Sequence, residues 1–270
     1  MPARLVGAAT VISVTFDDGW ADNVTAASLL RDYGMQGTFY VNTNTVGTST
    51  HLSWAQLAAM EADGHEIGGH ALDHVDLTAV DAREAHRQIL DDRASLTARG
   101  FAASSFAYPF GAFNSTVEHI VRDSGYASAR GAFGLRKIGY ASARAFALRK
   151  IEYPSARGAL RLRSITARRD SRPYSLPIPP PNPFAIVTPC CITADTPLSA
   201  LQNYIMRAEE AGGWVPLTLH RICDDCGGDA PAPSMSPATF ERLLAWLEPR
   251  RSRGTVVRTV ADVIAATAAS

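Results

Sequence analysis

The chain has 270 residues, four of them cysteines, and its 26 Lys and Arg balance its 26 Asp and Glu. This length suits one large α/β domain or two smaller domains. The zero net charge excludes a chain-wide basic surface for nucleic acid. No apolar run reaches the roughly 18 residues of a membrane-spanning helix. The 46% share of apolar residues argues against a disordered chain.

Predicted strands and helices alternate through the first half of the chain. The strands fall at 11–16, 37–41, 66–67 and 104–108, and the helices at 21–33, 54–63, 81–100 and 115–124. The pattern resumes with a helix at 197–211, a strand at 214–219, a helix at 237–247 and a closing segment at 256–266. Such alternation implies parallel strands with right-handed crossovers. The first apolar stretch runs straight into a charged motif, which indicates a strand rather than a signal peptide. We therefore expect a cytoplasmic protein, unless a leader is removed upstream.

A tandem repeat interrupts this rhythm in the middle of the chain. YASARGAFGLRKI at 126–138 is followed by related copies at 140–151 and 153–165. One copy is expected to supply a strand, and the others to form a surface insertion, since the unit is too short for a solenoid. Residues 130–172 hold twelve Lys or Arg and two Asp or Glu, a local net charge of +10. The proline-dense stretch at 172–184 cannot be helical and is expected to run as an extended loop.

Two adjacent carboxylates, Asp17 and Asp18, end the first predicted strand and precede Gly19. Neighbouring side chains on a strand point to opposite faces, but a turn at the strand end lets both reach one site. There they suit a metal ligand beside a general base. The alternative is a helix cap, in which Asp18 or Asp22 accepts hydrogen bonds from backbone N–H groups.

Two histidines, His70 and His74, follow the third predicted strand. At a spacing of four residues they would lie on one face of a helical turn and could reach one ion. The alternative is a pair of solvated loop histidines. Combined with an Asp from the first motif, they supply three ligands and leave a position open for water, as in catalytic zinc sites.

Two further motifs follow strands. Tyr108-Pro109-Phe110-Gly111 is either a plain turn or a turn whose backbone N–H points into the site as an oxyanion donor. His220 ends the strand at 214–219, where it is either a buried structural histidine or, opposite a metal and a base, a general acid. Candidates for substrate contact are Tyr108, Pro109, Trp214 and Leu219.

The cysteines indicate little chemistry. Only Cys223 and Cys226 have suggestive spacing, and the adjacent Cys190 and Cys191 make a poor second pair for a zinc site. We therefore expect a local disulfide or free thiols rather than a structural metal.

The motifs TFDDG, HALDH, YPFG and LTLH, in this order, resemble those of the polysaccharide deacetylase family, carbohydrate esterase family four. The resemblance covers about residues 10–128 and 195–266. It implies a distorted, incomplete (β/α) barrel, here a single catalytic domain over 1–270 with a repeat- and proline-rich insertion at about 130–189. It also implies metal-dependent removal of acetyl groups from carbohydrate. We further expect a monomer that binds no nucleic acid. By position, Asp17 is the base, Asp18, His70 and His74 hold one divalent ion, preferably Zn²⁺, Phe110 N–H is the oxyanion donor and His220 is the acid.

The chain departs from the family pattern at Ala107, where the family often has an Arg that orients the base. Arg130, or its repeat equivalents Arg144 and Arg157, are candidates to replace that guanidinium. The departure leaves open a catalytically weakened carbohydrate-binding relative, and an O-acetyl esterase is a second alternative. A third is an interaction protein that uses its basic segment on an anionic partner. The acetylated glycan itself is not fixed by the sequence.

Overall fold

The computed structural model describes residues 9–132, 174–189, 191–226 and 233–268. Its centre is a parallel sheet of seven strands in the order β5-β4-β3-β2-β1-β6, with β9 also paired to β1. The strands are β1 (Thr10–Phe16), β2 (Thr38–Val41), β3 (Glu66–Gly69), β4 (Ser105–Ala107), β5 (Ser128–Arg130), β6 (Gly213–Leu219) and β9 (Thr255–Val257). A small second sheet pairs β7 (Arg221–Ile222) with β8 (Ser234–Met235).

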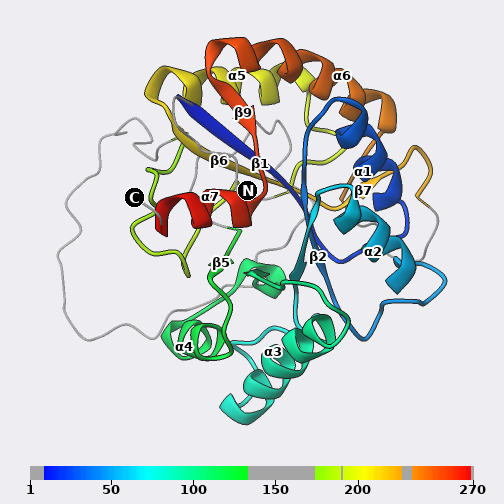
Figure 1. The fold of residues 1–270 in the computed structure, drawn as a ribbon, viewed down its shortest axis with the longest axis vertical. Coiled ribbons are helices and arrows are strands. Elements are labelled where there is room, and N and C mark those ends of the chain that lie inside the picture. Colours follow the sequence, from blue (N-terminus) through cyan, green and yellow to red (C-terminus); the bar gives the residue numbers. More distant parts are fainter. Residues whose placement is uncertain (1–8, 133–173, 190, 227–232, 269–270) are drawn as a thin grey trace, which may run out of the picture.

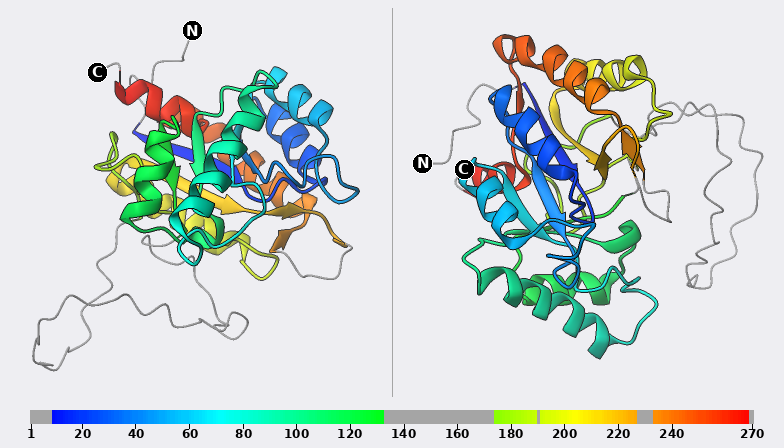
Figure 2. Two further views of the ribbon diagram at one scale, coloured as in Figure 1. Left: turned by 90° about the horizontal axis from the view of Figure 1, so that it is seen from below. Right: turned by 90° about the vertical axis from the view of Figure 1, so that its right-hand side faces the viewer.

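The helices surround this sheet as an arc. They are α1 (Asn23–Asp32), α2 (Trp54–Ala62), α3 (Ala82–Thr97), α4 (Ser115–Asp123), α5 (Leu198–Ala211), α6 (Pro237–Leu247) and α7 (Val260–Ala268), with 3₁₀ segments η1 (Pro109–Gly111) and η2 (Glu248–Arg253). Figure 1 shows α5 and α6, α1 and α2, and α3 and α4 in succession around the strands, and Figure 2 shows the same arrangement from two other sides. Strands inside and helices outside make an incomplete (β/α) barrel, which confirms the predicted fold class.

The strand β1 explains why the sheet holds together. All seven of its residues, TVISVTF, are buried, as expected for a strand that is covered on both faces. One edge pairs with β6 along its whole length, while the other edge pairs with β9 at Thr10–Ile12 and with β2 at Thr15–Phe16. The ring of Phe16 stacks on Phe39 of β2 and meets Phe240 of α6 edge to face. The core therefore forms between strands and helices that lie far apart in the sequence.

Side-chain caps mark the starts of several helices. Ser53 and Gln56 form a capping box at α2. Asp81 accepts a hydrogen bond from the backbone of Glu84 and so caps α3, although the reciprocal bond expected of a capping box is not among those described. The helix predicted at 237–247 has the bounds of α6.

The third strand is longer than predicted because of two glycines. Gly68 and Gly69 extend β3, although glycine is a poor strand former. A Cβ atom on Gly69 would collide with the Tyr126 hydroxyl and the Asp92 carboxylate, and one on Gly68 would collide with the Tyr40 ring. Consecutive strand residues point to opposite faces, so neighbouring side chains leave room only for glycine on both faces of β3 at this point.

The middle of the chain is described in part. The first repeat copy supplies β5, as expected of one copy, whereas the copies at 140–151 and 153–165 lie outside the described residues. In the proline-dense stretch, residues 174–184 contain no helix, and Leu176 bridges to Trp214. Of the positively charged segment at 130–172, the residues from 133 onward lie outside the described residues, so its expected surface position stays a prediction.

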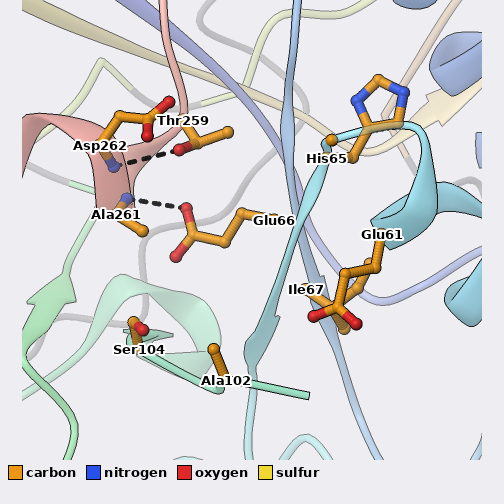
Figure 3. A pocket seen from close by; sticks show the side chains of 10 residues that line it. Glu61, His65, Glu66, Ile67, Ala102, Ser104, Thr259, Ala261 and Asp262 are labelled. Carbon is orange, nitrogen blue, oxygen red and sulfur yellow. Dashed lines mark hydrogen bonds between the residues drawn. The ribbon is translucent and has the colours of Figure 1, made fainter. Parts of the chain in front are cut away.

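The end of the barrel where the strands begin is closed by α7. Glu66, at the start of β3, accepts hydrogen bonds from Thr38 of β2, Ser105 of β4 and the backbone N–H of Ala261 in α7. Figure 3 shows this carboxylate reaching toward α7 across a pocket. Burial raises the pKa of Glu66, although its three donors oppose the shift. Among the helices in the described ranges, none is long and apolar enough to cross a membrane.

Candidate active site

The two adjacent carboxylates diverge at the end of β1. Asp17 continues the strand, since its backbone N–H donates to the carbonyl of Leu219 on β6. Asp18 has a φ of 73° and turns its side chain away from the strand. Both are largely buried, and they face different partners: Asp17 pairs with Arg130, and Asp18 faces His70 and His74.

The two histidines meet Asp18 from the loop after β3. The Asp18 Oδ1 atom lies 3.5 Å from His70 Nε2 and 3.3 Å from His74 Nε2. The expected helical turn is wrong: residues 70–75 form no helix, and positive φ angles at Ala71 (65°) and His74 (52°) fold the loop back. The loop thus brings both rings to one side by backbone reversal rather than by helical periodicity.

Hydrogen bonding and burial prepare both imidazoles as ligands. His70 Nδ1 donates to the Ala107 carbonyl over 2.7 Å, which leaves Nε2 to face Asp18. Burial opposes ionisation of His70, but Asp18 and Asp17 raise its pKa above the ordinary value. Burial, together with nearby His70, lowers the pKa of His74 to about 4, so this ring is neutral at neutral pH. Burial would raise the pKa of Asp18, but His70, His220 and His74 lower it below the usual range.

Backbone strain is concentrated here. Six non-glycine residues in the described parts of the chain have a positive φ, and four of them lie in these motifs: Asp18, Ala71, His74 and Phe110. Each such conformation costs on the order of 1–3 kcal/mol and persists only where the surroundings enforce it. The concentration supports a functional reading of these loops.

Arg130 supplies, beside Asp17, the guanidinium that the family often carries at the position of Ala107. It stands at the end of β5, is 1% exposed and pairs with Asp17. Ala107 is its register partner on the adjacent strand β4, so the charge enters from one strand further along the sheet. Its guanidinium also lies 4.9 Å from the centre of the Tyr40 ring. Of the three arginines considered from the sequence, this one is beside Asp17, while Arg144 and Arg157 fall outside the described residues.

The predicted acid and oxyanion donor lie near the same cluster. His220 follows β6, its carbonyl accepts a hydrogen bond from Asn23, and its buried Nδ1 has no hydrogen-bond partner among the described residues. Phe110 is 57% exposed, and its ring meets His74 edge to face at 4.5 Å. His220 is also close enough to help lower the pKa of Asp18, so both residues flank the Asp18 and histidine cluster.

All four predicted substrate contacts are buried. Tyr108 is 1% exposed, and its hydroxyl donates to the Phe184 carbonyl. Pro109, which follows Tyr108, is buried, and so is Leu219, which precedes His220. Trp214 is fully buried at the start of β6, where its indole donates to Ser13. This is the opposite end of the strand from His220, so the structure does not bring Trp214 to the site.

The donor set fits a divalent metal ion. The candidate ligand atoms of Asp18, His70 and His74 lie within 4.8 Å of one another. Asp18 Oδ1 is buried and has no hydrogen-bond partner within the described part of the chain, a costly state that an ion would relieve. Ligands about 2.0–2.1 Å from a tetrahedral zinc ion stand about 3.4 Å apart, close to the two distances from Asp18 to the histidines.

Sequence reasoning missed one residue beside this cluster, Trp20. Its indole Nε1 donates to Asp18 Oδ2 over 3.1 Å. A donor side chain two residues after a candidate ligand was a usable signal, but its direction depends on the turn at Gly19.

The expected local disulfide is present between Cys223 and Cys226.

The comparisons with known proteins agree with this geometry. Residues 6–129 match the family model described as polysaccharide deacetylase. A gellan lyase from Bacillus sp. is 36% identical over 126 residues, 46% of this chain and 5% of that protein. The peptidoglycan-N-acetylglucosamine deacetylase PgdA of Listeria monocytogenes is 32% identical over 109 residues, 39% of this chain and 22% of that protein. The chain thus matches less than a quarter of the length of either relative.

Solved structures support the fold over a longer range. The peptidoglycan deacetylase PdaC from Bacillus subtilis aligns with a TM-score of 0.55 at 16% identity, covering 100% of this chain and 94% of that chain. At this identity the likeness concerns the fold alone. The likeness to the family therefore comes from the sequence match: residues 6–129 resemble the polysaccharide deacetylase family.

Proposed function

We propose that the chain is a metal-dependent hydrolase that removes N-acetyl groups from an acetylated amino-sugar polymer. The observation that carries this proposal is the pairing of two neighbouring sites. The Asp18, His70 and His74 cluster can hold an ion, and directly beside it Asp17 is held by Arg130. A site that only bound carbohydrate would need neither a fixed base nor an open ligand cluster.

Each residue has a distinct task in the proposed reaction. A bound divalent ion, for which zinc suits two imidazoles and a carboxylate, would polarise the acetyl carbonyl and activate water. Asp17 accepts the proton of the attacking water, and Arg130 keeps its carboxylate in place. The backbone N–H of Phe110 donates to the oxygen that gains negative charge. His220 donates a proton to the departing sugar nitrogen, and no covalent intermediate with the protein is required.

The alternatives differ in how they relate to the site. The weakened carbohydrate-binding relative was suggested by Ala107, and Arg130 supports the catalytic reading because it supplies the missing charge from β5. An O-acetyl esterase would use the same residues, with His220 protonating oxygen instead of nitrogen. The monomeric state, the compartment, the single-domain organisation and the lack of nucleic-acid binding stay predictions.

Acetate release tests the proposal. Chitin oligosaccharides, peptidoglycan and an ester-acetylated glycan are each incubated with untreated, chelated and zinc-restored protein. We expect release from an N-acetylated substrate that chelation abolishes and zinc restores. Release only from the ester would favour the esterase. Binding without release from any of the three would favour the weakened relative, and release that survives complete chelation would contradict the metal dependence.

A further inference from the structure

Trp20 divides the two oxygens of the Asp18 carboxylate between different partners. Its indole N–H donates to Oδ2, whereas Oδ1 faces the two histidine Nε2 atoms. The second torsion angle of an aspartate is broad, so an unrestrained carboxylate could turn either oxygen, or both, toward an ion. The indole bond removes this freedom and leaves Oδ1 as the atom presented to the cluster.

The indole itself is held from several sides. Its ring stacks on His51 with centroids 4.8 Å apart and planes 20° apart, and the two backbones form an antiparallel bridge. The Arg221 guanidinium carbon lies 4.7 Å from the centre of the same ring. Arg221 is fixed in turn by a 2.7 Å bond from its Nε to Asp22. The direction of the N–H is thus set by the loop before α2, by β7 and by the turn after β1.

We propose that Trp20 is a positioning residue for the metal site, and that its indole N–H restricts Asp18 to binding the ion through Oδ1 alone. This inference rests on the proposed function, because it needs an ion at Asp18, His70 and His74. Hydrogen bonds to the ligands of a metal typically change its affinity by about 10–100-fold. The structure gives His70 such a partner too, since its Nδ1 donates to the Ala107 carbonyl.

A platform for stacking a sugar ring is the other role that an aromatic residue could have here. Such a platform needs an uncovered ring face, and the ring of Trp20 is engaged by His51 and Arg221. A platform role predicts that replacing Trp20 raises KM and leaves metal affinity unchanged. The positioning role predicts that replacing Trp20 lowers metal affinity and leaves KM little changed.

The test is the zinc affinity of Trp20→Phe, which keeps a ring and loses the N–H. Competition with a fluorescent chelator gives the Kd for zinc, and we expect it to rise about 10–100-fold. Trp54→Phe is the matched control, since Trp54, the first residue of α2, packs near Phe101 and Arg99, which follow α3. Its Kd should stay within error of the unaltered protein. At saturating zinc, Trp20→Phe should recover most of its turnover, with KM little changed.

The outcomes separate this inference from the proposed function. If the unaltered protein binds zinc no better than His70→Ala with His74→Ala, the proposed function fails. If the unaltered protein binds zinc and Trp20→Phe binds it equally well, only the inference about Trp20 is overturned.

A second measurement uses the unaltered protein, so it does not depend on whether Trp20→Phe folds. In the unaltered protein, the NMR signal of the Trp20 indole N–H should move on zinc addition, because its acceptor belongs to a ligand. The chain has four tryptophans, so assigning the Trp54, Trp214 and Trp246 signals through their Phe variants identifies the Trp20 signal by elimination. Those three signals should not move. A stationary Trp20 signal during zinc binding would overturn the inference.

Discussion

The adjacent acids Asp17 and Asp18 show how backbone conformation can give neighbouring residues different chemistry. Their side chains have the same functional group, but the positive φ of Asp18 sends them to different partners. The sequence predicted that both would reach one site, because a strand end followed by glycine allows a turn. It could not show which partner each would meet, since those partners come from β3 and β5.

Asparagine variants separate the two roles. Asp17→Asn should keep the bound metal and lose about 10²–10⁴-fold in turnover, the usual contribution of a placed general base. Asp18→Asn should lose metal and activity together, with partial recovery in excess zinc. Metal analysis beside acetate release measures both effects. Metal lost with Asp17→Asn but kept with Asp18→Asn would reverse the assignment.

The position of the guanidinium beside Asp17 can be tested by moving it between strands. Arg130→Gln should lower turnover by at least tenfold with zinc retained, and should destabilise the fold by about 3–5 kcal/mol, because Asp17 stays buried without its partner. Adding Ala107→Arg places a guanidinium on the register partner, about 4.8 Å away along the sheet, and should restore part of both. Turnover at saturating zinc and urea unfolding are the measurements. An Arg130→Gln protein with unchanged turnover would remove Arg130 from the proposed reaction.

At the scale of elements, the loop after β3 marks a limit of periodicity arguments. A four-residue spacing between histidines suggests a helical turn, but it only requires that both rings reach one point. The real loop achieves this with left-handed residues at Ala71 and His74. Sequence patterns report helices and strands well because these repeat, whereas a loop of this kind is fixed by its surroundings. The side chain of Asn42, for example, donates to the carbonyls of His70 and Ala71.

A buried polar network ties α3 to the strands beneath this loop. Asp92 of α3 accepts hydrogen bonds from Thr43, after β2, and from Tyr126, before β5. Burial raises the pKa of Asp92 to about 7, although both donors oppose the shift. The carboxyl group is therefore favoured in its protonated form within the fold, while the unfolded chain ionises near pH 4.

This difference gives stability a pH dependence. Because the folded pKa is the higher one, the contribution of Asp92 is complete below about pH 4 and is lost as the pH rises to about 7, by at most about 1.4 kcal/mol per pH unit. Asp92→Asn should therefore lose less stability than the unaltered protein between pH 5 and pH 7. Urea unfolding at several pH values measures this, with the exposed neighbour in Asp91→Asn as the control. Parallel curves for Asp92→Asn and the unaltered protein would contradict the prediction.

At the scale of the whole molecule, the tandem repeat contributes one strand to the described fold. The first copy provides β5 and Arg130, and the second and third copies hold none of the residues assigned to the site. The sequence predicted that one copy would be a strand, but three similar copies could not reveal which. Only pairing with β4 distinguishes them, and that pairing is a tertiary contact.

Deleting residues 139–165 should therefore leave folding and acetate release within a few-fold of the full chain, because insertions carried on loops are tolerated thermodynamically. Deleting 126–165 instead removes all three copies, and with them β5 and Arg130, and should abolish both. Circular dichroism and acetate release compare the two proteins. A shortened protein that folds but releases no acetate would place the later copies in the site.

The central position of β1 has a consequence in time. Its partner β2 follows within about 20 residues, but β6 and β9 lie about 200 or more residues further along the chain. A ribosome adds roughly 5–20 residues per second, so the edge of β1 that pairs with β6 stays unpaired for on the order of 10–40 s after β1 is synthesised. During that interval TVISVTF is a short, uncharged segment of high β-propensity, the kind that pairs with other chains when left exposed. Slower elongation or loss of β6 should therefore appear first as aggregation during synthesis, before any loss of activity in the molecules that complete the sheet.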